Sequence, residues 1–217
     1  MKNFWSLDPD WKARLKHSFL TVSLTLFFCG AHPAYAVNIN FVGSMGLGNA
    51  AVSSTSGTIV SSRSLPYGGG LLFGFRMLPK LSMELGFLYM PRAFQEKFSD
   101  DTSNGITFTT VQIPLLLRFQ ILNSLSIGVG GYFSHGIGNV TVVGPASSTS
   151  HSYANANFGA DDYGAIASLG IKFPLILKLS LILDGRYLYG FQNVNKVNGV
   201  STYFRDLQAL VGVRLGM

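Results

Sequence analysis

Cysteine is almost missing from this chain of 217 residues. The single example, Cys29, falls in a segment with the features of a leader, so we expect neither disulfides nor thiolate chemistry in the remainder. After residue 36 no stretch approaches the roughly 20 apolar residues that a membrane-spanning helix requires. The sequence also lacks zinc-ligand spacings and a phosphate-cradling glycine loop. These absences disfavour disulfide-stabilised domains, helical membrane proteins and nucleotide-dependent enzymes.

The first 36 residues have the three parts of a secretion signal. Basic residues at positions 12, 14 and 16 precede a short apolar stretch (19–28), and Ala34-Tyr35-Ala36 supplies the small-x-small cleavage site. We therefore predict a signal peptide over 1–36 and one domain over 37–217. An uncleaved anchor is an alternative. Lipid attachment at Cys29 is another, disfavoured because bulky Phe28 stands where a small residue is needed.

The charge of the predicted domain does not indicate nucleic-acid binding. Residues 37–217 hold 12 Lys or Arg and 8 Asp or Glu. The excess of positive charge is spread along the chain and forms no basic stripe, which is poor support for a nucleic-acid surface. We expect no nucleic-acid partner.

Apolar residues recur at every second position in eight runs, the pattern typical of strands. The predicted strands are Val37–Gly48, Tyr67–Met77, Leu81–Met90, Phe108–Ile121, Leu125–Phe133, Asp162–Phe173, Leu177–Phe191 and Leu207–Met217. The alternate positions carry glycine, small polar residues and a few charges, too small and polar for a dry core. The bulkier face is therefore expected to meet lipid. A soluble β-sandwich or a lipocalin-like barrel is the alternative, but its outward face should be charged. The sequence predicts an all-β, eight-stranded, antiparallel, up-and-down transmembrane β-barrel.

The connections alternate between long and short. The long ones are 49–65, 91–107, 134–161 and 192–206, and the other three are a few residues each. Bacterial outer-membrane barrels have short periplasmic turns and longer outer loops. We therefore predict a Gram-negative outer-membrane protein with both termini in the periplasm. Aromatic residues near the strand ends are expected to form the two interfacial girdles: Tyr67, Tyr89, Phe108, Phe133, Tyr163, Tyr189 and Phe191 outside, and Phe75, Phe119 and Phe173 inside.

The face opposite the apolar one should line the lumen. The polar network predicted there consists of Arg76, Glu84, Gln112, Arg118, Asp184, Arg186, Gln208 and Arg214, with Gln120, Lys172 and Asp206 on the same face. Charges enclosed in a narrow tube are costly unless they are paired. We expect Glu84 to pair with Arg76 or Arg118, and Asp184 to pair with Arg186 or Arg214. The hypothesis is a lumen filled by side chains, and a small pore or proton path is the alternative.

Two regions resemble the PorT-like family of small outer-membrane β-barrel proteins. VQIPLLLRF (111–119) resembles the family's fourth strand, and DYGAIASLGIKF (162–173) with LDGRYLYGFQNV (183–194) resembles its penultimate hairpin. The matching positions are Ile113, Pro114, Leu115, Arg118, Gly164, Gly170, Arg186, Tyr187 and Gly190. The resemblance implies a membrane-embedded barrel and no common molecular activity.

Two positions depart from the expected pattern, and a third, which matches the family, is unusual in a strand. Gln112 stands where the family usually has glutamate, which removes a lumen charge. Met217 replaces the terminal aromatic residue typical of barrels that the outer-membrane assembly machinery recognises. Pro114 cannot donate a ladder hydrogen bond, so it predicts a β-bulge.

Residues that could serve an enzyme are few. His135 follows Ser134 in sequence, and adjacent strand residues point to opposite faces, which is poor geometry for a nucleophile and its base. HSYANAN (151–157) faintly resembles the His motif of outer-membrane lipid A deacylases, but its spacing differs. Asp100-Asp101 and Asp161-Asp162 are more typical of solvated turns than of proteases or calcium sites. We predict no catalytic residue, metal site or cofactor.

The expected function is therefore a structural or porin-like surface role, without catalysis. Segment 134–161 is the longest loop and the best candidate for contact with an external ligand. The other expected partners are outer-membrane lipids, lipopolysaccharide and the outer-membrane assembly machinery. A narrow passive channel for small solutes is the first alternative, and a lipid-modifying enzyme the second.

Overall fold

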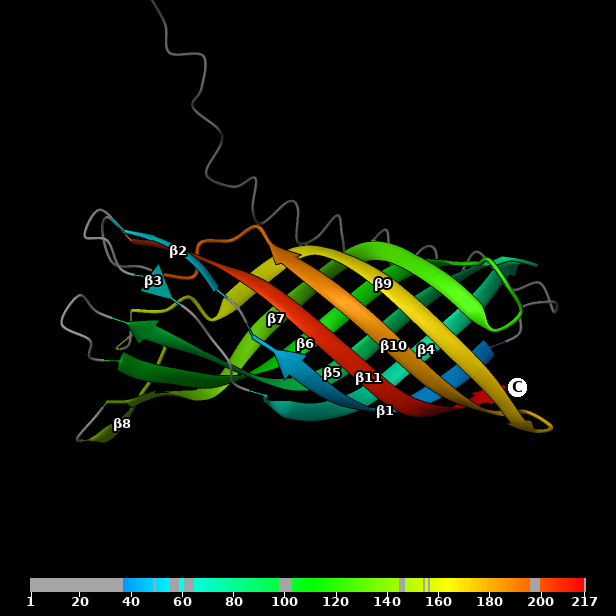
Figure 1. Cartoon of the computed structure of the whole chain (residues 1–217), viewed down its shortest axis with the longest axis horizontal. Coiled ribbons are helices and arrows are strands. Elements are labelled where there is room, and N and C mark those ends of the chain that lie inside the picture. Colours follow the sequence, from blue (N-terminus) through cyan, green and yellow to red (C-terminus); the bar gives the residue numbers. More distant parts are fainter. Residues whose placement is uncertain are drawn as a thin grey trace, which may run out of the picture. The chain divides into compact units, whose positions relative to one another are not determined.

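Eight antiparallel strands form a closed barrel in the computed structural model (Figure 1). The described residues are 37–48, 50–54, 59–60, 65–97, 103–144, 147–153, 155, 157–195 and 200–216. The barrel strands are β1 (Val37–Leu47), β4 (Tyr67–Leu78), β5 (Leu81–Lys97), β6 (Ser103–Gln120), β7 (Leu125–Val143), β9 (Asp161–Ile176), β10 (Leu179–Gly190) and β11 (Val200–Gly216). Each pairs with the next, and β1 pairs with β11 to close the ring. The predicted barrel is confirmed, whereas the predicted signal peptide (1–36) lies outside the described residues.

Apolar residues recur at every second position in the sequence, and in the structure side chains alternate between exposed and buried along each strand. In β10, Ile182, Asp184 and Arg186 are buried in the lumen, while the odd-numbered side chains between them point outward. The bulky outward residues are exposed, as Leu169 and Val211 illustrate, each with 52% of its surface accessible. Within the described residues, no helix is long and apolar enough to cross a membrane.

Several strands are longer than a membrane crossing requires. A transmembrane strand needs about 9–11 residues, but β5, β6 and β7 have 17, 18 and 19. Because the turns at one end are short, the surplus extends from the long-loop end. The predictions of loops at 91–107 and 134–161 were therefore wrong over much of their length, since hydrogen-bonded pairing continues beyond the apolar band.

Three short strands add to the barrel at the same end. β2 (Ala50–Ser54) pairs with β11, β3 (Ile59–Val60) pairs with β5, and β8 (Ser148–His151) pairs with β7. The β7–β8 hairpin lies within the segment predicted to be the longest loop. That segment is thus partly a β-structured extension of the barrel.

At the opposite end, short turns connect the strands. Pro79–Lys80 joins β4 to β5, residues 121–124 join β6 to β7, and Leu177–Lys178 joins β9 to β10. The strand predicted to begin at Leu177 begins at Leu179 instead, because Leu177 has a positive φ of 45° and occupies the turn. Ile121, predicted as the last residue of a strand, lies in a bend.

The barrel interior is more apolar than the sequence interpretation assumed. Val42, Leu72, Leu88, Met90, Ile182 and Leu210 form one buried inward cluster, and Leu116, Tyr132, Ile166 and Leu188 form another. The expectation of an inward face too small and polar for a dry core was wrong. Glycines on neighbouring inward positions leave the space that these large side chains fill.

Pro114 does not cause the predicted bulge. The register between β5 and β6 is the same before and after it, with Leu85 opposite Leu115 and Leu88 opposite Gln112. The two intervening pairs are missing from the ladder. The strand tolerates a residue without an N–H by omitting bonds locally rather than by inserting a residue.

Candidate functional site

Two carboxylates and two guanidinium groups meet near the middle of the lumen, and we term Glu84, Arg118, Asp184 and Arg186 the central ion network. Arg118 donates from Nε to Glu84 at 2.8 Å and from Nη1 to Asp184 at 3.4 Å, with a further short contact between Nη2 and Asp184. Arg186 donates to Glu84 at 2.6 Å and to Asp184 at 2.8 Å. The four side chains are nearly inaccessible to solvent. Equal numbers of opposite charges make their burial tolerable.

The bonds of the central ion network cross the lumen. In the strand order around the barrel, β10 lies opposite β5, so the contact from Arg186 to Glu84 spans the interior. Arg118 on β6 likewise reaches Asp184 on β10. Side chains that bond across the diameter obstruct the path along the axis.

The other predicted network residues have different partners. Gln208 donates an amide hydrogen bond to Gln112 at 3.0 Å, again across the lumen, because β6 and β11 are opposite strands. Arg214 donates to Asn40 at 2.9 Å and makes no ion pair with Asp184 among the contacts of the described residues. Arg76 is exposed at the short-turn end. The predicted residues are thus divided between the buried lumen and one mouth.

A second buried ion network lies toward the long-loop end, and sequence reasoning missed most of it. Arg92 contacts Asp162 at 2.8 Å and Asp206 at 3.0 Å, and the Tyr132 hydroxyl donates to Asp162 at 2.8 Å. We term these four residues the outer ion network. Asp162, expected in a solvated turn, has only 3% of its surface exposed. Even-numbered residues face inward along β5 from Glu84 to Met90. Continuing this alternation by one more even-numbered position would have predicted that Arg92 also faces the lumen.

An apolar cap adjoins the outer ion network at the long-loop end. It consists of the buried residues Ile106, Phe108, Val140, Phe158, Val194 and Phe204, with Val142 and Tyr153 packed against them. The Arg92 guanidinium lies 4.5 Å from the centre of the Phe204 ring, and the Phe108 and Phe204 rings are 5.5 Å apart. The Tyr153 hydroxyl donates to the Thr109 carbonyl at 3.0 Å, and burial raises the pKa of Tyr153 to about 12.

The aromatic residues of the outer surface are mostly as predicted. Tyr67, Tyr89, Phe133, Tyr163, Tyr189 and Phe191 are exposed toward the long-loop end, and Phe119 and Phe173 toward the other. Phe75 is half-buried. Phe108 was wrongly assigned to the girdle: its even number puts it on the inward face, where it joins the apolar cap.

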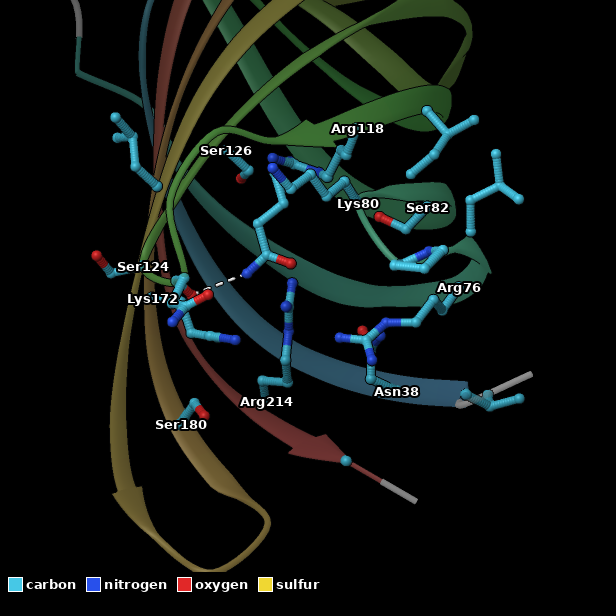
Figure 2. A pocket seen from close by; sticks show the side chains of 18 of the residues that line it. Asn38, Arg76, Lys80, Ser82, Arg118, Ser124, Ser126, Lys172, Ser180 and Arg214 are labelled. Carbon is cyan, nitrogen blue, oxygen red and sulfur yellow. Dashed lines mark hydrogen bonds between the residues drawn. The ribbon is translucent and has the colours of Figure 1, made fainter. Parts of the chain in front are cut away.

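The short-turn end of the lumen is open and positively charged. A cavity of about 240 Å³ is lined there by five basic residues, which we term the cationic mouth: Arg76, Lys80, Lys172, Lys178 and Arg214. Figure 2 shows Arg76, Lys172 and Arg214 extending into this space from β4, β9 and β11. Arg118 marks its inner limit, where the central ion network begins.

The residues considered for catalysis or metal binding are dispersed. His135 Nδ1 lies 2.7 Å from Asp161 in an exposed pair, and His151 is exposed on β8. Among the described residues, no group of three or more His, Cys, Asp or Glu could hold a metal ion. Asp100 and Asp101 lie outside the described residues.

Comparison with protein families matches residues 31–196 to the outer membrane protein beta-barrel domain. The match covers most of the closed barrel described above. The chain belongs to this family. It is accordingly an integral β-barrel protein of the outer membrane, as the strand pattern predicted. The narrower resemblance to PorT-like proteins remains a prediction.

Solved structures of similar fold are small outer-membrane barrels of low sequence identity. OprG from Pseudomonas aeruginosa aligns with a TM-score of 0.57 and 14% identity, covering 84% of this chain and 95% of its own. Ail of Yersinia pestis has a TM-score of 0.42 and 12% identity over 84% and 97% of the two chains. Neisserial surface protein A has a TM-score of 0.42 and 14% identity over 83% and 96%. No curated protein matches the chain. The likeness to OprG shows the fold alone.

Proposed function

We propose that this protein is a closed, non-enzymatic scaffold of the outer membrane that displays a β-structured extension on the cell surface. The observation that carries the proposal is the continuous filling of the lumen. Arg186, Leu88, Gln112 and Leu116 have at most 1% of their surface exposed, so a water-sized sphere does not reach them. An eight-stranded barrel is just wide enough for side chains to fill its interior.

The two ion networks support a structural role for the interior charges. A passage for solutes needs polar groups that water or the solute can reach. Here the carboxylates of the central ion network are bonded to guanidinium groups across the barrel, and the outer ion network is covered by the apolar cap. These arrangements favour a rigid closed barrel over the narrow channel considered as the alternative.

The surplus length of the strands supports the surface role. Short turns face the periplasm in barrels of this kind, so the longer strands β5, β6 and β7 project outward. The segment 134–161 contributes the end of β7 and the exposed β8. We propose that this extension contacts external ligands and lipopolysaccharide, and that the outer-membrane assembly machinery inserts the barrel.

Planar-bilayer recording of the purified barrel tests the closed lumen. We expect no long-lived ohmic steps after insertion, because the cross-lumen bonds leave no continuous water path. Insertion is verified in parallel by the mobility difference between unheated and boiled samples recovered from vesicles. Stable, uniform conductance steps from folded protein would contradict the proposal and favour the channel.

A lumen variant sharpens the same test. Gln112→Ser combined with Gln208→Ser removes one bond across the diameter and shortens both side chains. We expect brief current bursts that the unaltered protein lacks, because other cross-lumen contacts remain. The proposal of a plugged lumen would be contradicted if the variant and the unaltered barrel both showed the same steady conductance. Ions would then cross the barrel by a path that Gln112 and Gln208 do not obstruct.

A further inference from the structure

In the part of the chain that the structure describes, the cationic mouth has no counter-charge of its own. Its lining residues include no Asp or Glu, and the nearest carboxylates, in the central ion network, already accept from Arg118 and Arg186. Among the described residues, none of the five basic side chains of the mouth makes an ion pair, and Arg214 bonds only to the neutral Asn40 amide. Like charges in one confined space repel each other unless an anion or water screens them.

The chemistry of the lining suits an oxyanion. Arg76, Lys172 and Arg214 extend into the cavity from three different strands, so their donors converge from different sides (Figure 2). Ser82, Ser126 and Ser180 also line the cavity. Guanidinium and ammonium groups bind phosphate oxygens by short charge-assisted hydrogen bonds. The cavity volume of about 240 Å³ is several times the ~30 Å³ that one water occupies in the liquid.

The turns around the mouth show where it lies in the membrane. Their apolar side chains are strongly exposed: Leu78 at 59%, Leu122 at 60% and Ile176 at 70%. Leu177 is wholly exposed at the tip of the β9–β10 turn. Four large apolar side chains in or directly beside three separate turns are suited to lipid rather than water. Exposed apolar side chains next to Lys80 and Lys178 are the composition expected where a barrel meets lipid headgroups.

We propose that the cationic mouth is a phosphate-binding site that opens toward the periplasmic face of the membrane. The ligand is a phosphate group with free oxygens, carried either by an anionic phospholipid of the inner leaflet or by a small phosphorylated solute. Arg76, Lys172 and Arg214 bind its oxygens, and the anion neutralises the mouth. This site is separate from the plugged lumen and from the surface extension.

Calorimetric titration of the barrel in a neutral detergent, with inorganic phosphate and glycerol phosphate as probes, tests whether the site binds a small phosphorylated solute. Reconstitution in nanodiscs of phosphatidylcholine with and without phosphatidylglycerol tests the lipid arm, and native mass spectrometry counts the lipids retained. The variants are Lys172→Gln with Arg214→Gln, and, should that pair fail to fold, Arg76→Gln with Lys172→Gln. Arg205→Gln is the matched control, since Arg205 lies at the opposite end and packs 3.4 Å from the Tyr189 ring centre.

We expect the paired variants to weaken phosphate binding, or retention of phosphatidylglycerol, at least tenfold, while Arg205→Gln leaves both unchanged. Retention of lipid without binding of free phosphate would assign the site to the membrane, and the reverse would assign it to a solute. The proposal is overturned if neither probe binds the unaltered barrel. It is also overturned if the folded paired variants bind as tightly as the unaltered protein. Heat-dependent gel mobility reports folding in every case.

Discussion

The central ion network and the cationic mouth both place basic side chains inside the same barrel, but on different strands and with opposite results. Arg186 on β10 and Arg118 on β6 are buried against two carboxylates. Arg76 and Lys172, a short distance toward the turns, have no carboxylate partner among the described residues and line an open cavity. The comparison shows that carboxylate placement, rather than the number of basic residues, decides where this lumen is closed.

The physical reason lies in the cost of removing charge from water. A buried charge is tolerated when it is paired and hydrogen-bonded, which the central ion network achieves with equal numbers of acids and bases. The mouth keeps its charges where solvent or an anion can reach them. The same barrel wall therefore supports a rigid neutral layer and an electropositive opening.

Removal of one carboxylate from the closed layer should have the largest effect on stability. Glu84→Ala leaves Arg118 and Arg186 to share Asp184 in a buried space. Breaking a buried ion pair in this way costs about 3–5 kcal/mol. We expect the unfolding midpoint in urea, followed by circular dichroism in detergent, to fall accordingly.

Ser82→Ala is the control for Glu84→Ala, because Ser82 is on the same strand but faces the mouth. Its effect should stay within about 0.5 kcal/mol, as for substitutions away from buried networks. Equal losses from the two variants would contradict the distinction between the closed layer and the mouth.

Glycine substitutions test the difference between the closed part of the lumen and the mouth by the tightness of packing in each. A Cβ at Gly164, in the closed part, would collide with the backbone carbonyl of Tyr189, which is fixed in the β9–β10 ladder. At Gly74 it would meet the end of the Asn38 side chain, which lines the mouth and, unlike a ladder carbonyl, can change rotamer. We expect Gly164→Ala to cost about 1–3 kcal/mol or to block folding, and Gly74→Ala to cost much less.

Urea unfolding and the yield of heat-modifiable protein measure both glycine variants. Gly185→Ala is the outward-facing control, since its Cβ would have no contact closer than 3.9 Å. A Gly74→Ala variant as unstable as Gly164→Ala would mean that the wall at the mouth is as tightly packed as the closed layer.

Alternation along the strands, together with the alternately long and short connections, was sufficient to predict the architecture. A strict period of two assigns every residue of a strand to one of two faces, so the inward positions of Glu84, Arg118, Asp184 and Arg186 followed from the register. The ends of the strands did not follow. Pairing beyond the membrane needs no apolar band, so the polar parts of β5, β6 and β7 resemble loops in sequence.

The partners of the lumen residues depend on distances across the barrel. The alternation of odd and even positions along a strand shows which residues face inward, but it does not give these distances. Both Arg186 and Arg214 face inward, but only the register between strands shows that Arg186 reaches Glu84 while Arg214 lies beside Asn40. Arg92 was missed because it was assigned to the loop 91–107. Asp162 began a predicted strand but was interpreted, together with Asp161, as a solvated turn residue. The sequence interpretation did not predict the apolar clusters inside the barrel. The larger number of leucines on the outward face made the inward face look mainly polar by comparison.

The smallest change in stability is expected when one of the uncompensated charges of the mouth is removed. This prediction bears most directly on the comparison between the mouth and the central ion network. Lys172→Gln removes a positive charge near Arg76 and Arg214, so repulsion in the folded barrel decreases. We expect stability to stay within about 0.5 kcal/mol of the unaltered protein, with any change toward greater stability at low salt. Added sodium chloride should raise the urea midpoint of the unaltered barrel more than that of the variant, because salt screens the repulsion that the substitution has already removed. A loss of several kcal/mol on Lys172→Gln would instead show that the mouth is a paired network like the one above it.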